Sequence, residues 1–424
     1  MLTRRRSANY KWLVVGMLWF ICFFNYADRQ AIFSVFPILK HDYHFNDEEL
    51  GRIAMAFTLV YALTAPFAGQ VGDRFARKTV ILAGLYIWSA ITGLTSVCTR
   101  VWHFVLVRGS EGLGETFYFP ASMSLVSDYH SGKTRSRAMS LHQTSVYAGT
   151  IGGGALAGWM AQRGQWRECF VLLGVLGVAL GFVLAAFLRE PQRNEAEAAE
   201  RTDTRAEVAP ASIPFGQFLR SLVETPTALL LVLAFFGANA VALVFLSWMP
   251  LFLNEKFKMT LTSAGVGATF FIQVGSMIGS ALGGFLADRW RRIHPGGRIL
   301  VQATGTLAGA PFLFWIGSAG EVGPLIVAMS AFGITKGLYD SNIWASLYDV
   351  VPVARRGTAV GLMNMIGWLG GALGAYTIGA AVQARRITMS GGIASTSAVY
   401  LAVCATLLVA ALVHAPRDMA RIDP

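Results

Sequence analysis

Charged residues are scarce in the long apolar stretches of this sequence, and those that occur there are candidates for chemistry. They fall in three stretches: Asp28 and Arg29; Arg108, Glu111 and Glu115; and Lys336 and Asp340. A charged side chain in the middle of a membrane-spanning helix costs at least ~2.5–3.5 kcal/mol on insertion scales. If these stretches span a membrane, each charge is therefore a functional candidate.

Spacing predicts how these side chains are directed. Arg108, Glu111 and Glu115 follow an i, i+3, i+7 pattern and share one face of a helix. Asp28 and Arg29 are adjacent, so their side chains point about 100° apart and should have different partners. Lys336 and Asp340 are four residues apart, so they can pair within their own helix.

These residue types suit the coupling of proton movement to anion binding. A carboxylate held by an arginine away from water takes up a proton more readily when an anion engages that arginine. The hypothesis is that Asp28 and Glu115 carry protons, while Arg29 and Arg108 bind an anion or hold those carboxylates. The alternative is that these charges form static salt bridges that only hold the helices together.

The composition indicates what kind of element must position these residues. Of the 424 residues, 54% are hydrophobic and 14% charged, against a usual charged share of about 25%. This excludes a disordered chain, a coiled coil and an ordinary soluble enzyme. Twelve apolar segments are long enough to cross a bilayer. They are 12–36, 49–71, 79–98, 102–126, 138–161, 167–188, 226–253, 262–287, 297–318, 323–348, 358–384 and 393–414.

The basic residues predict an orientation. With a cytoplasmic N-terminus, most Lys and Arg residues fall in cytoplasmic loops, which places both termini in the cytoplasm of an inner-membrane protein. The net charge of +11 is then topological and faces anionic lipid, so no nucleic-acid partner is expected. The first apolar run carries Asp28 and Arg29 and does not read as a cleavable signal peptide. No metal or cofactor motif is present, so no cofactor is expected.

The chain divides into three regions. Residues 1–188 form an N-terminal six-helix bundle, 189–222 a polar cytoplasmic linker, and 223–424 a C-terminal six-helix bundle. The loop around Asp73 recurs around Asp288 at an offset of 215 residues, and Asp128 recurs as Asp349 at an offset of 221. The halves are therefore duplicates in the same orientation, an architecture that places a site near the bilayer midplane between them. The fold class is an all-α membrane protein with twelve transmembrane helices.

The repeated loop, G-x-x-x-D-R-x-x-R-K in its first copy, resembles that of the major facilitator superfamily. The resemblance covers nearly the whole chain and implies a transporter that works by alternating access and is no enzyme. It also implies a charged cytoplasmic gate that favours the outward-facing state. The expected gate residues are Gly69, Asp73, Arg74, Arg77, Lys78, Asp128, Arg135, Asp288 and Arg289.

N-Y-x-D-R in the first span and R-x6-E followed by F-P in the fourth resemble two groups within that superfamily. One is the anion:cation symporters, which move organic anions and sugar acids with protons. That resemblance implies proton carriers at Asp28 and Glu115 and anion contacts at Arg29 and Arg108, and it adds Tyr26 and Tyr61 to the pocket. The other is the Spinster-like transporters, which move lysolipids and carry D-R and R-x-x-x-G-x-G-E in the same spans.

Further polar residues are candidates for the lining of the central site, and each is also consistent with helix packing. They are Glu111, His142, Gln143, Lys336, Asp340, Asn342 and Asn364. Glu111 and the Lys336–Asp340 pair depart from both groups. The resulting expectation is a monomer in the lipid bilayer that moves a small organic anion with protons. A Spinster-like transporter of lysolipids and amphiphiles is the alternative, and a transporter-like sensor is a weaker one.

Overall fold

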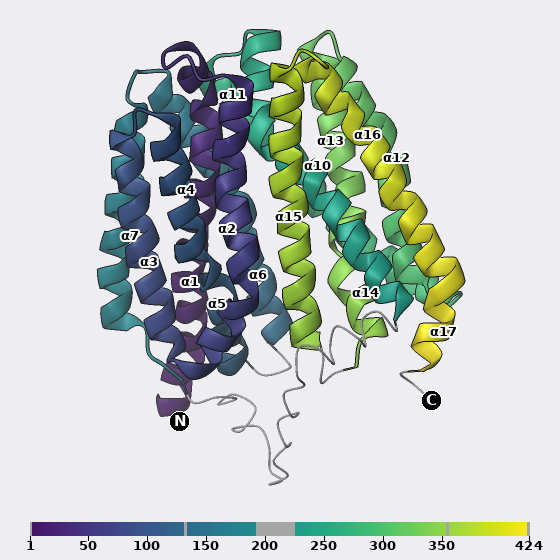
Figure 1. The fold of residues 1–424 in the computed structure, drawn as a ribbon. Coiled ribbons are helices and arrows are strands. Elements are labelled where there is room, and N and C mark those ends of the chain that lie inside the picture. Colours follow the sequence, from purple (N-terminus) through teal and green to yellow (C-terminus); the bar gives the residue numbers. More distant parts are fainter. Residues whose placement is uncertain (1, 131–133, 192–224, 353–355, 422–424) are drawn as a thin grey trace.

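The computed structural model describes residues 2–130, 134–191, 225–352 and 356–421. The side chains of residues 2–9, 69, 70, 72–74, 136 and 357 also lie outside the description. The described chain is all-helical (Figure 1). Its first elements are α1 (Leu2–His41), α2 (Asp47–Arg74), α3 (Arg77–Leu94), η1 (Thr95–Val97), α4 (Val101–Thr116), α5 (Tyr118–Tyr129), α6 (Arg135–Ala161) and α7 (Trp166–Phe187). The later elements are α10 (Pro226–Phe257), α11 (Leu261–Arg291), α12 (Gly297–Ser318), α13 (Val322–Asp340), α14 (Ile343–Val350), α15 (Arg356–Gln383), α16 (Met389–Val409), η3 (Ala410–His414) and α17 (Ala415–Ala420).

Local chemistry fixes where these helices begin and break. Asn46 and Glu49 form a capping box at the start of α2, with both side chain-to-backbone hydrogen bonds at 2.9 Å. The expected span 102–126 is two helices, α4 and α5, that meet at Phe117. Pro120 explains the break, because it has no N–H to donate to the carbonyl of Thr116. The expected span 323–348 is likewise divided into α13 and α14.

The helices from α1 to α7 pack mainly on one another, and so do those from α10 to α17. In the first group α1 lies along α6, and in the second α11 lies along α13. The groups meet where α2 lies against α15 and where α6 lies against α11 (Figure 1). The second contact depends on glycine, because a Cβ on Gly154 would come within 2.8 Å of the carbonyl oxygen of Gly265.

Polar contacts join the two groups at the end opposite the chain termini (Figure 1). The Lys40 ammonium lies 3.1 Å from the Glu255 carboxylate. The Thr262 hydroxyl donates to the Gln162 side-chain oxygen at 2.6 Å. The buried core of the first group also takes in Trp248 from α10 at this end. The groups are therefore held together firmly at the end away from the termini.

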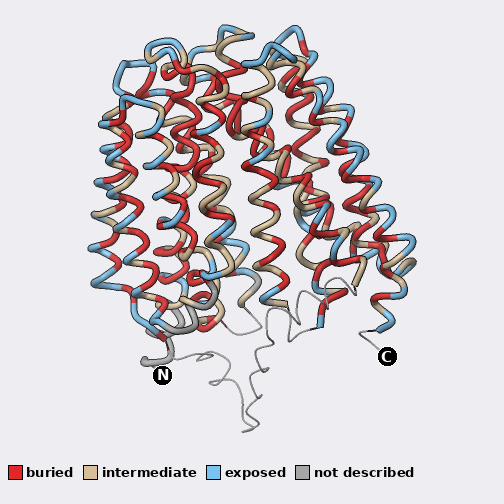
Figure 2. Tube along the Cα trace, in the orientation of Figure 1, coloured by how far each residue is buried: buried red, intermediate tan, exposed pale blue. Residues whose placement is uncertain are grey.

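Large apolar side chains are exposed on the outer faces of the helices, while the surfaces between helices are buried (Figure 2). Exposed apolar area on this scale is unfavourable in water and typical of a lipid-facing surface. In the part of the chain that the structure describes, ten helices are long and apolar enough to cross a membrane. The expected spans 102–126 and 138–161 are not among them. The first is divided and carries the α4 charges; the second, α6, is rich in glycine and polar residues.

Candidate functional site

A buried ion pair connects α1 and α4 in the first group. The Arg29 Nε donates to the Glu115 carboxylate, and the two side chains are 10% and 0% exposed. Desolvation offsets much of the attraction in such a pair, but removing one partner leaves an uncompensated charge and is strongly unfavourable. The two residues therefore control one another's charge state.

Aromatic rings surround the Arg29 guanidinium. Its carbon lies 4.7 Å from the ring centroid of Tyr26, 4.8 Å from that of Phe57 and 4.9 Å from that of Tyr61. Trp368, on α15 of the second group, lies 5.6 Å away. Rings at these distances attract a cation through their π faces. Arg29 thus contacts both helix groups, and the structure brings the expected Tyr26 and Tyr61 to it.

Arg108 pairs with Glu111 one helical turn along α4, and both side chains are almost completely buried. The Arg108 guanidinium carbon lies 4.7 Å from the centroid of the same Phe57 ring that contacts Arg29. Phe57 approaches α4 closely because Gly112 has no side chain. A Cβ at that position would lie 2.5 Å from the Phe57 carbonyl oxygen.

Asp28 is directed away from Arg29, as expected for adjacent helical residues. Its carboxylate accepts a hydrogen bond from the Thr92 hydroxyl of α3 at 3.3 Å, and that hydroxyl lies 3.1 Å from Glu111. Two arginines and three carboxylates therefore share the buried region between α1, α3 and α4. Within the described part of the chain, four buried polar atoms of this cluster have no hydrogen-bond partner: Asp28 Oδ1, Arg29 Nη1, Arg108 Nε and Glu115 Oε1.

The expected residues on α6 are not brought to Arg29. His142 is fully buried, and its Nε2 lies 3.1 Å from the Tyr118 hydroxyl, which donates to the carbonyl of Leu18. Gln143 is exposed. His142 is thus placed as a packing residue with a hydroxyl partner, and its role in binding stays a prediction.

In the second group Lys336 and Asp340 form the expected ion pair within α13. Tyr147 of α6 lies within electrostatic range of both charges, so this pair also faces the first group. Asn342 instead donates to the backbone carbonyls of Gly283 and Leu338, each at 3.1 Å. Asn364 is half-buried on α15.

The gate residues of the first group form a network at the end that holds the termini. Arg77 pairs with Asp128 of α5 and with Glu190, whose carboxylate lies 2.8 Å from the Arg77 Nε. Glu190 also accepts the backbone N–H of Lys78 at 2.7 Å and so caps α3. Arg135 donates to backbone carbonyls near the end of α5.

The expected gate residues Gly69, Asp73 and Arg74 belong to α2 by their backbone, but their side chains lie outside the described part of the chain. In the second group Asp288 is 75% exposed and lies 3.9 Å from Arg298. Arg289 is exposed. In this conformation the described gate charges pair within their own helix group, and a contact across the groups stays a prediction.

The sequence analysis missed Thr92, Phe57 and Glu190. Thr and Phe are common in apolar helices and gave no signal, and Glu190 lies among several charges at the start of the polar linker. The Arg298–Asp349 pair could have been found, because it repeats Arg77–Asp128 at the offset of 221.

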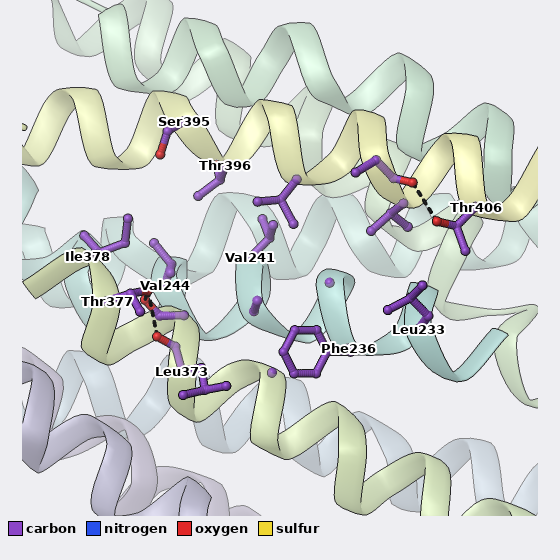
Figure 3. Close-up of a pocket in the computed structure, with 17 residues that line it drawn as sticks. Leu233, Phe236, Val241, Val244, Leu373, Thr377, Ile378, Ser395, Thr396 and Thr406 are labelled. Atoms are coloured by element: carbon purple, nitrogen blue, oxygen red, sulfur yellow. Dashed lines mark hydrogen bonds between the residues drawn. The ribbon is translucent and has the colours of Figure 1, made fainter. Parts of the chain in front are cut away.

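A groove of about 390 Å³ lies between α10, α15 and α16, away from the charged cluster (Figure 3). Its walls are apolar residues, glycine, serine and threonine. The Thr377 and Thr406 hydroxyls donate to carbonyls of their own helices at 2.7 and 2.8 Å. The groove offers no charge to an anion and suits an apolar chain.

Long apolar helices around a buried charged centre are typical of a multi-pass membrane transporter. The chain belongs to the Major Facilitator Superfamily, whose family model matches residues 18–375. Members of this family transport solutes and are not enzymes, so the resemblance proposed from the repeated loop is confirmed.

Relatives come from both groups that the sequence resembles. Protein spinster homolog 1 of Homo sapiens is 30% identical over 393 residues, which cover 87% of this chain and 72% of that protein. The probable galactarate/D-glucarate transporter GudP of Escherichia coli is 24% identical over 444 residues, covering 99% of this chain and 96% of that protein. The crystal structure of a bacterial homologue of the human lysosomal transporter Spinster, inward-facing and unoccupied, matches with a TM-score of 0.79 and 20% identity. That match covers 97% of this chain and 98% of that one.

Proposed function

We propose that this protein is a proton-coupled secondary transporter that moves a small organic anion, such as a sugar acid, across the inner membrane. The observation that carries the proposal is the buried Arg29–Glu115 pair, with Trp368 of the opposite helix group against the same guanidinium. An anion that binds Arg29 competes with Glu115 for the positive charge. Glu115 then takes up a proton, because an unpaired carboxylate away from water is unfavourable.

The roles of the cluster follow from its contacts. Arg29 is the main anion contact, with its Nη1 buried and free of hydrogen-bond partners among the described residues. Arg108 is a second positive charge beside the same Phe57 ring. Asp28 and Glu115 are the proton carriers. Tyr26 and Tyr61 orient Arg29 through their ring faces.

Transport proceeds by alternating access between two six-helix bundles, residues 1–188 and 223–424, joined by a cytoplasmic linker, 189–222. Twelve spans follow if α4 with α5, and α6, cross the membrane beside the ten apolar helices. With both termini in the cytoplasm, the contacts Lys40–Glu255 and Thr262–Gln162 close the outer side. The protein works as a monomer, and its gate opens and closes at the end that holds the termini.

A Spinster-like transporter of lysolipids or other amphiphiles is the second candidate. The identity of 30% to protein spinster homolog 1 favours it, as does the aromatic wall around Arg29. Such a substrate would present an anionic headgroup to Arg29 and an apolar chain to the rings.

A ligand-stabilisation measurement on the purified, detergent-solubilised protein tests these candidates. D-glucarate, galactarate, a lysophospholipid and a neutral hexose are each added, and the apparent melting temperature is recorded. A ligand that binds only the folded state at 100 times its Kd adds about 2.7 kcal/mol of stability. We expect a sugar acid to stabilise the native protein and not Arg29→Gln.

Arg163→Gln is the matched control, because this arginine lies in an exposed turn against Trp159, far from the cluster in the chain. It should leave the sugar-acid effect unchanged. Stabilisation by lysophospholipid alone would favour the second candidate. Equal stabilisation by the neutral hexose, or an effect that survives Arg29→Gln, would contradict the anion site.

A further inference from the structure

One threonine hydroxyl lies between two buried carboxylates. The Thr92 hydroxyl oxygen is 3.3 Å from Asp28 Oδ2 and 3.1 Å from Glu111 Oε1, and all three residues are at most 1% exposed. Other buried threonines use their hydroxyl differently. Thr58 and Thr116 donate to carbonyls of their own helices. Thr92 faces the charged cluster instead.

Counting hydrogens shows what this geometry requires. A hydroxyl has one hydrogen to donate and can accept through its lone pairs. If both carboxylates were ionised, Thr92 could donate to only one, and the other would face the hydroxyl oxygen with no hydrogen between them. That repulsion is removed when one of the two carboxyl groups carries a proton and donates it to Thr92.

The second partner of each carboxylate indicates which one holds the proton. Glu111 is neutralised by Arg108 in a buried ion pair. Asp28 has Thr92 as its hydrogen-bond partner, and its other oxygen has none among the described residues. The proton therefore belongs on Asp28, whose carboxyl group donates to Thr92, while Thr92 donates to Glu111.

The charge balance of the surroundings agrees with this arrangement. Two arginines and three carboxylates sum to one negative charge when all are ionised, and one bound proton makes the cluster neutral. The titratable and charged groups that face Asp28 come from several elements. They are Arg29 beside it on α1; Arg108, Glu111 and Glu115 on α4; and Cys169 on α7.

We propose that Asp28, Thr92 and Glu111 form a proton-storing triad in which Thr92 is the positioning residue. The inference deepens the proposed proton coupling and rests on it for its purpose. The triad lies on the α3 side of α1, while Arg29 contacts Glu115 and Trp368. The stored proton and the anion contact thus occupy separate places in one cluster.

Infrared difference spectroscopy tests the triad without any substrate or gradient. The purified protein at pH 7 should show the carbonyl band of a protonated carboxyl group, and the band should shift in deuterated water. Asp28→Asn should remove it. Thr92→Val, which keeps the shape and deletes the hydroxyl, should weaken the band at pH 7 and move it to the higher frequency of a carboxyl group without a hydrogen bond.

Two further variants separate the hydroxyl from packing. Thr92→Ser should keep the wild-type band, and Thr58→Val, at another buried threonine, should leave it unchanged. Absence of the band from the wild-type protein, its persistence in Asp28→Asn, or an unaltered band in Thr92→Val would each overturn the proposal. Sugar-acid stabilisation that depends on Arg29 would still stand in that case, so failure of the triad is distinguishable from failure of the proposed function.

Discussion

Asp128 and Asp349 lie 221 residues apart and hold equivalent arginines. Asp128 pairs with Arg77, the first residue of α3, and Asp349 pairs with Arg298, the second residue of α12, at 2.9 Å to each carboxylate oxygen. Arg77 and Arg298 are themselves 221 residues apart. The duplication therefore preserved an ion pair that fixes the start of one helix to the end of another in each half.

Asp128→Asn should reduce stability more than a matched change on the surface. Its partner Arg77 is 5% exposed, and removal of one member of a buried pair costs about 3–5 kcal/mol. Asp288→Asn is the control, because Asp288 is 75% exposed and such pairs contribute about 0–1 kcal/mol. The measurement is the apparent melting temperature in detergent. Equal melting temperatures for the two variants would show that the buried pair contributes nothing.

Trp368→Ala should weaken the response to an anion without unfolding the protein. The indole is the contact of the second helix group with Arg29 and also packs on Tyr61, at a centroid distance of 4.9 Å. A cation–π contact of this kind contributes about 0.5–2 kcal/mol, so Kd for the stabilising sugar acid should rise about 2- to 30-fold. Trp315→Ala, on a lipid-facing surface of α12, is the control. An unchanged Kd in Trp368→Ala would remove this tryptophan from the site.

The sequence predicted the charged centre well, because a charge in an apolar helix is costly and therefore conspicuous. The separate partners of Asp28 and Arg29 also followed from their adjacent positions on a helix. The partners themselves could not be predicted, since Thr92 and Phe57 reach the cluster only through the rotation and close packing of α2, α3 and α4. The break at Phe117 was missed because the apolar pattern continues through it, although Pro120 was a signal for it.

Gly265→Ala should loosen the contact between α6 and α11. A Cβ on Gly265 would press on the backbone of Gly154, so the helices must move apart. Overpacking of this kind costs about 1–3 kcal/mol. Gly16→Ala is the control, because a Cβ there has open space and alanine favours a helix.

The separation can be measured directly by cross-linking. Cysteines that replace Gln162 and Thr262, whose side chains are hydrogen-bonded, should form a disulfide readily in the parent protein. The four native cysteines are buried and should not compete. The yield should fall severalfold with Gly265→Ala and stay constant with Gly16→Ala. Equal yields in both would show that close glycine packing does not hold this end together.

Glu190→Ala should release the start of the linker. This carboxylate caps α3 through the backbone N–H groups of Arg77 and Lys78, at 3.1 and 2.7 Å, and also pairs with the Arg77 guanidinium. Loss of a helix cap costs about 0.5–2 kcal/mol, and loss of the ion pair frees residues 189–191 from the helix bundle. Limited trypsin digestion should therefore cleave after Arg189 several times faster than in the parent protein. Glu321→Ala is the control, because Glu321 precedes α13 without a side-chain cap bond. If Glu190→Ala is digested at the parental rate, the contact does not anchor the linker.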